Sequence, residues 1–172
     1  SRSKIASAKC PYYFLTSPKA LSSAVLACAL PLSSCGPRER PRMADLTLPS
    51  LSGRSETELA RCPAEKCLTV GVAPWCGVCR TKAGLIKRLS EIVKARGVAT
   101  RVVVGMDTEE AVREFAREFG PDTLLDPEGR LRVSGVPHFL VSDSSGVIVN
   151  RAAGMPGPVR TAEALAWYLA LD

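Results

Sequence analysis

The sequence predicts a single domain of the α/β class. A chain of 172 residues is long enough for one domain with a real core and too short for two ordinary ones. Hydrophobic residues make up 46% and charged residues 23% of the chain, which is typical of a globular protein. Apolar, β-rich runs alternate with helical segments in the order β-α-β-α-β-β-α, and this alternation predicts the class.

Seven segments make up this pattern, and local signals mark their ends. Strands are predicted at 68–73, 100–106, 137–142 and 147–151. Helices are predicted at 77–95, 108–119 and 158–171, the first two because apolar residues recur at helical spacing. Gly97 ends the first helix, Asp107 and Glu110 form a capping box at the second, and Pro158 begins the last.

The net charge of +6 does not indicate a nucleic-acid-binding protein. Residues 1–34 carry four lysines or arginines and no acid, which leaves 19 basic residues against 17 acidic ones in the rest of the chain. The chain has nine aromatic residues in all, and no basic stripe is interleaved with them. We therefore expect no nucleic-acid partner.

The first 34 residues predict a signal peptide. A basic start leads into an apolar run at 20–32, which is too short to span a bilayer. The sequence L-S-S-C-G that follows resembles the lipobox of bacterial lipoproteins, which implies cleavage before Cys35 and lipidation of its thiol. The alternative is an ordinary cleavage site with an incidental cysteine. Either way we expect an exported protein of the periplasm or cell envelope.

Residues 35–54 predict a flexible tether, because prolines, serines and charges fill them without an apolar period. The folded domain is then expected at 55–172. A lipid on Cys35 and this tether would anchor the domain to a membrane surface. A disordered tail without a lipid is the alternative.

Seven cysteines are present, and removal of the signal peptide and lipidation of Cys35 leave four of them in two pairs. The predicted strand at 68–73 separates the pairs by roughly 20 Å. Thiolates that share one zinc ion lie within roughly 4 Å of one another, so a shared metal site is disfavoured. For the first pair, Cys62 and Cys67, we expect a structural disulfide, with a second redox relay as the alternative.

The second pair, in Cys76-Gly77-Val78-Cys79, lies where this strand meets the first helix. A thiolate at Cys76 would face unpaired backbone N–H groups and the positive end of the helix dipole, both of which favour the charged form. Thiol–disulfide exchange also needs a second, more buried sulfur that releases the mixed disulfide. Cys76 is therefore the predicted attacking cysteine and Cys79 the resolving one.

Two stretches resemble the thioredoxin superfamily. A-P-W-C-G-V-C at 73–79 is similar to its active site, and V-S-G-V-P-H-F-L-V at 133–141 is similar to the loop and strand with its cis-proline. L-L-D-P-E-G at 124–129 and D-S-S-G-V-I at 143–148 look more like the exported TlpA/ResA-like thiol-disulfide oxidoreductases. The resemblance spans 68–171 and implies a thioredoxin-like fold, a central mixed sheet flanked by helices.

The resemblance also implies a function and a set of site residues. It implies a protein-disulfide reductase without a cofactor, which draws electrons from a membrane thiol carrier and passes them to exported proteins. Pro137 would be the cis-proline, and the backbone of Val136 would pair with the substrate main chain. His138 could contact substrate or stabilise the Cys76 thiolate, with a partly solvated strand residue as the alternative, and Trp75 is a candidate substrate contact, with a packing aromatic as the alternative.

Several residues depart from the family pattern. Val78 stands where thioredoxins usually have proline, which leaves the direction of electron flow open, so an oxidase or isomerase is an alternative. Val70 stands where many members bury an acid, and Lys82 where ResA-like reductases often carry glutamate, which predicts slow resolution by Cys79. A copper(I) metallochaperone using Cys76, Cys79 and His138 is a further alternative.

Overall fold

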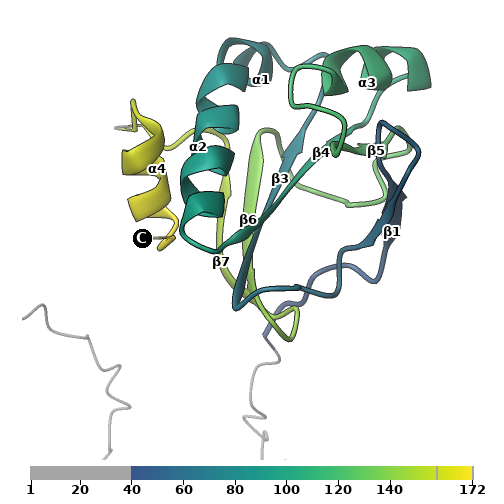
Figure 1. Ribbon diagram of the computed structural model, residues 1–172. Coiled ribbons are helices and arrows are strands. Elements are labelled where there is room, and N and C mark those ends of the chain that lie inside the picture. Colours follow the sequence, from purple (N-terminus) through teal and green to yellow (C-terminus); the bar gives the residue numbers. More distant parts are fainter. Residues whose placement is uncertain (1–39, 158, 172) are drawn as a thin grey trace, which may run out of the picture. The chain divides into compact units, whose positions relative to one another are not determined.

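The computed structural model describes residues 40–157 and 159–171 (Figure 1). The predicted signal peptide and the predicted lipidation site at Cys35 lie outside these residues. In the part of the chain that is described, no helix is both long and apolar enough to cross a bilayer.

A mixed sheet of five strands forms the centre of the domain, in the order β5-β4-β3-β6-β7 (Figure 1). Three strands run parallel: β3 (Lys66–Val72), β4 (Ala99–Gly105) and β5 (Leu124–Asp126). The other two, β6 (His138–Asp143) and β7 (Ile148–Ala153), are antiparallel to their neighbours. Residues 67–72 of the central strand are all buried, which explains their nearly continuous apolar sequence.

Four helices accompany the sheet: α1 (Gly77–Thr81), α2 (Ala83–Ala95), α3 (Glu109–Ala116) and α4 (Ala162–Tyr168). The longer helix α2 and α4 lie side by side on one face of the sheet (Figure 1). Apolar side chains of α3 belong to the same core cluster. The predicted order of elements is confirmed, and the short strand β5 is added to it.

The predicted helix ends differ from the observed ones for local reasons. The helix expected at 77–95 is divided at Lys82, whose backbone (φ −108°, ψ 6°) is not helical. The cap of α3 is Thr108, whose hydroxyl accepts from the N–H of Ala111, and not the predicted Asp107 box. The last helix begins only after Thr161, whose hydroxyl caps it in the same way.

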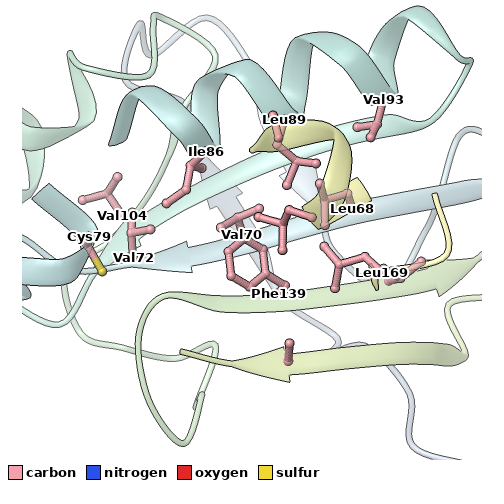
Figure 2. Packing of buried hydrophobic residues seen from close by; sticks show 14 of the residues in the cluster. Leu68, Val70, Val72, Cys79, Ile86, Leu89, Val93, Val104, Phe139 and Leu169 are labelled. Carbon is pink, nitrogen blue, oxygen red and sulfur yellow. The ribbon is translucent and has the colours of Figure 1, made fainter. Parts of the chain in front are cut away.

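The core between the sheet and α2 and α4 is closely packed (Figure 2). Phe139 of β6 is the largest fully buried side chain and lies at its centre. Leu68 and Val70 of β3 face it, and Ile86 and Leu89 of α2 cover it. This face carries the side chains of alternate strand positions, as the period of two requires.

The opposite face of the sheet is covered by a hairpin of β1 (Thr47–Pro49) and β2 (Glu56–Glu58). Leu48 and Leu59 are fully buried there, in a second cluster with Leu140. The tether predicted over 35–54 is therefore wrong for residues 42–54, which belong to the folded domain. Strand β1 has three residues and buries only one side chain, so it is too short to produce a recognisable alternation of apolar and polar residues in the sequence.

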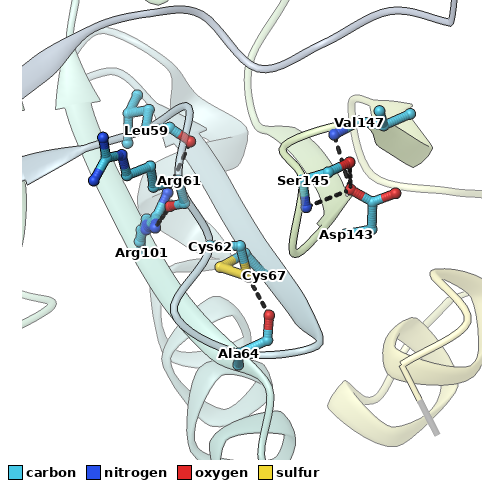
Figure 3. The surroundings of a disulfide bond; sticks show 9 residues. All are labelled: Leu59, Arg61, Cys62, Ala64, Cys67, Arg101, Asp143, Ser145 and Val147. Carbon is cyan, nitrogen blue, oxygen red and sulfur yellow. Dashed lines mark hydrogen bonds between the residues drawn. A yellow bond between two sulfur atoms is a disulfide. The ribbon is translucent and has the colours of Figure 1, made fainter.

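A disulfide between Cys62 and Cys67 closes the loop that enters β3, with their Cα atoms 5.7 Å apart (Figure 3). Arg101 of β4 donates to the carbonyl oxygens of Leu59 and Arg61, immediately before this loop. The structure thus contains the expected pairing, at the end of β3 away from the second cysteine pair.

Candidate active site

The second cysteine pair lies where β3 gives way to α1. Cys76 is the N-cap residue of α1, and its sulfur accepts a hydrogen bond from the backbone N–H of Cys79 at 3.1 Å. Both thiols are free. Both residues are largely buried: Cys76 is 6% exposed and Cys79 is not exposed at all, so only Cys76 retains any accessible surface.

The loop before β6 meets the first of these sulfurs. The peptide bond between Val136 and Pro137 is cis, and the Cys76 thiol donates to the carbonyl oxygen of Val136 at 3.5 Å. Residues 60 positions apart in the sequence thus form one site. A polypeptide that reached the sulfur of Cys76 would lie against this backbone.

Cys79 is held in its neutral form by its surroundings. Burial, followed by the hydrogen bond with Cys76, raises the pKa of the Cys79 thiol to about 12. In the described structure, no carboxylate contributes to this shift, and Val70, where the resemblance led us to look for an acid, is a buried apolar residue. A resolving thiol that must lose a proton without a nearby base should react slowly.

The raised pKa predicts a single reactive thiol in the native protein at moderate pH. Iodoacetamide at pH 7 to 9 should label Cys76 and leave Cys79 unlabelled, as mass spectrometry of the folded, reduced protein would show.

Because the pKa of Cys79 rises from 9.0 in the unfolded chain to about 12 in the folded protein, the unfolded chain loses this proton at lower pH. The dithiol form therefore keeps its full stability below about pH 9 and loses stability towards pH 12. Labelling of both thiols at pH 8 without unfolding would contradict this assignment.

An exposed apolar surface lies beside the attacking sulfur. Trp75 is 61% exposed and Val78 is 46% exposed. The indole N–H of Trp75 donates to the carbonyl oxygen of Met106 at 2.8 Å, so the ring is held without being buried. Trp75 is therefore not a core aromatic. No sequence pattern indicates Met106, whose left-handed backbone (φ 62°) presents that carbonyl.

His138 is buried, with 7% exposure, and is therefore less exposed than the partly solvated strand residue offered as an alternative. Its Nδ1 lies 3.2 Å from the carbonyl oxygen of Gly135, to which it donates. Burial lowers the pKa of His138; the hydrogen bond to Gly135 opposes this effect and the charge of Arg151 adds to it, with a net lowering that favours the neutral ring. Nowhere in the described chain do three His, Cys, Asp or Glu side chains group as metal ligands.

The loop that carries Val136 is fixed from below by Asp126, which sequence reasoning missed. This buried carboxylate accepts from the backbone N–H groups of Arg130 at 2.9 Å and Leu131 at 2.8 Å. The side chain of Leu131 then fills the space next to Gly71, 3.5 Å from where a Cβ atom would lie. The D-P-E-G sequence, an acid before a turn, was the available signal.

Solved bacterial structures resemble this fold. The thiol:disulfide interchange protein DsbE of Chlorobium tepidum has a TM-score of 0.62 at 19% identity, covering 77% of this chain and 97% of that one. The exposed lipoprotein thioredoxin Etrx1 of Streptococcus pneumoniae has a TM-score of 0.60 at 19% identity, covering 74% and 98%. StoA of Bacillus subtilis has a TM-score of 0.57 at 17% identity, covering 72% and 94%.

No protein-family model matches the sequence, and no curated protein matches it. The solved structures share fewer than one residue in five with this chain, so they establish its architecture alone. Their similarity agrees with the mixed sheet and with the helices on its faces. The chain has the thioredoxin-like fold.

Proposed function

We propose that this protein is a thiol-disulfide oxidoreductase that reduces disulfides of exported proteins. The observation that carries the proposal is the arrangement of two free thiols at the start of α1. Cys76 retains a small exposed fraction and contacts the carbonyl oxygen of Val136, next to Pro137, while Cys79 is fully buried and protonated. This asymmetry is what a two-step exchange requires.

The exchange consists of two displacements at sulfur. The Cys76 thiolate attacks one sulfur of the substrate disulfide, which forms a mixed disulfide and releases the other substrate sulfur as a thiolate. The Cys79 thiol then loses its proton and attacks the sulfur of Cys76, which releases the second substrate thiol. Two electrons pass to the substrate, and the enzyme is left with a Cys76–Cys79 disulfide.

Regeneration of the dithiol requires a second thiol donor, and we assign this role to a membrane thiol carrier. The predicted signal peptide and the lipobox-like sequence at Cys35 support an exported protein anchored to a membrane by a lipid. A solved structure of similar fold is titled an exposed lipoprotein thioredoxin. The disulfide between Cys62 and Cys67 fits an oxidising compartment.

We assign a structural role to the Cys62–Cys67 disulfide. It lies at the start of β3, with Cys67 as the second residue of the strand, whereas Cys76 follows the end of β3, so the strand separates the two pairs by roughly 20 Å. Arg101 already holds the adjoining backbone to β4. Electron transfer between the pairs would need sulfur atoms in contact.

The reduction potential of the Cys76–Cys79 couple tests the proposed direction of electron flow. We expect a value near that of thioredoxin, about −270 mV, whereas a value near −120 mV would indicate an oxidase. The measurement equilibrates the protein with thiol buffers and counts alkylated cysteines by mass spectrometry. The Cys62→Ser/Cys67→Ser variant is the control, because removing a structural disulfide should leave this potential unchanged.

A further inference from the structure

A second open site lies on the sheet face that β1 and β2 share. The pocket has a volume of about 300 Å³, within the lower range of ligand sites. Its apolar lining comes from the second core cluster: Met43, Leu131, Val133, Leu140 and Ile148. The hairpin covers only part of this face. The side chains of Leu131, Val133 and Ile148 therefore remain partly exposed at the pocket.

The charged residues that line this pocket are all basic. Arg42, Arg132 and Arg151 line it, and no aspartate or glutamate does so among the described residues. In that same part of the chain, none of the three has a carboxylate within ion-pair distance, whereas Arg113 has Glu109 at 3.0 Å. We call this site, defined by the three arginines and its apolar lining, the arginine pocket.

Backbone hydrogen bonds hold the three arginines in place. The N–H of Arg132 donates to Gly129 in the turn that the Asp126 carboxylate fixes. Arg151 lies on β7 opposite Leu140, and Arg42 pairs with Val147 as an isolated bridge. A site whose backbone is already ordered loses less entropy when it binds a ligand.

The arginine pocket adjoins the loop against which a substrate of Cys76 would lie. Ser134 and His138 line the pocket and are each two residues from Val136. Two residues of extended chain span roughly 7 Å. The carbonyl oxygen of Val136 is in turn 3.5 Å from the sulfur of Cys76. A polypeptide held at Cys76 can therefore reach the pocket with residues a few positions from its reacting cysteine.

We propose that the arginine pocket binds a substrate segment that combines acidic and apolar side chains close to the disulfide. The inference rests on the proposed function and specifies its substrate class. The three guanidinium groups pair with the carboxylates of that segment, and the partly buried Leu131, Val133 and Ile148 receive its apolar side chains. Arg132 and Arg151 thereby determine specificity without touching the reacting sulfur atoms.

The test compares two synthetic peptides with the same disulfide ring and different tails. One tail alternates glutamate with leucine, and the other alternates lysine with leucine. Single-turnover reduction by the pre-reduced protein is followed as a function of peptide concentration. We expect the acidic peptide to half-saturate at about tenfold lower concentration, with a similar maximal rate, because docking and not chemistry differs.

Charge-reversed variants test whether the arginine pocket causes the preference for the acidic peptide. In Arg132→Glu/Arg151→Glu, and less fully in Arg132→Gln/Arg151→Gln, the preference for the acidic tail should disappear or reverse. The matched control is Lys87→Glu/Lys94→Glu, which changes the net charge equally on exposed positions of α2, a helix on the other face of the sheet. Its preference should stay that of the unmodified protein. Each preference is a ratio within one variant, so a uniform loss of activity does not affect it.

Two results would overturn the inference while the proposed function stands. The first is equal half-saturation by both peptides in a protein that reduces the neutral hydroxyethyl disulfide. The second is an equal loss of preference in the α2 control, which would mean that overall charge and not the pocket attracts the tail. Failure to reduce hydroxyethyl disulfide and both peptides would instead contradict the proposed function, and with it the inference.

Discussion

Replacement of Cys76 by serine should reduce the rate of disulfide reduction by roughly 10³-fold or more, because a hydroxyl cannot replace the attacking thiolate. The remaining thiol, Cys79, is fully buried and has a pKa raised to about 12. It therefore does not reach a substrate, and almost all of it is protonated at neutral pH. Single-turnover reduction of hydroxyethyl disulfide measures the loss.

The variant Cys79→Ser should behave differently. Cys76 can still attack, but the mixed disulfide now has no internal thiol to displace it. The variant should accumulate a covalent adduct with its substrate, visible as an increase in intact mass that a reducing agent reverses. The same adducts, isolated from cells, would identify natural substrates. If the adduct formed on Cys79 in a Cys76→Ser protein, the assignment of the two roles would be reversed.

Replacement of Phe139 by alanine should lower the free energy of unfolding by about 3 to 5 kcal/mol. Phe139 is fully buried between the sheet and the helices, so removing its ring leaves a cavity that well-packed neighbours cannot fill (Figure 2). Denaturation in urea, with the midpoint and slope compared with the unmodified protein, measures the loss.

The matched control for this prediction is Phe119→Ala. Phe119 is only partly buried and packs edge-on against Phe115, with ring centroids 5.4 Å apart. Its removal exposes surface near solvent and leaves no closed cavity, so a clearly smaller loss is expected. Equal losses for the two variants would show that Phe139 is not the centre of the core.

Patterns within short stretches of the sequence were enough to predict the elements that position the cysteines. β3 and the start of α1 follow from an apolar run and an amphipathic period, and both fix Cys76 at a strand-to-helix junction. The same local signals do not resolve a change at one residue, so the break in the helix at Lys82 was missed. The break is a change in the backbone dihedral angles of one residue, and the spacing of apolar residues along the sequence does not encode such a change.

Elements that depend on distant partners could not be predicted. β1 and β5 have three residues each and exist because they pair with other segments, as Ser50 does with Leu124. Met106 holds Trp75 through a backbone carbonyl, and this contact leaves no side-chain pattern in the sequence. Such short strands and backbone contacts are stable only when tertiary packing supplies their partners.

By itself, the sequence determined the α/β class, the position of the Cys76 and Cys79 pair at a strand-to-helix junction, and the segment that carries Pro137, because residues close together in the chain carry each of these signals. The tertiary structure alone decided how far each thiol is buried and that the three arginines share one pocket. Arg42, Arg132 and Arg151 are neighbours there only because strand pairing and one tight turn bring them to the same sheet face.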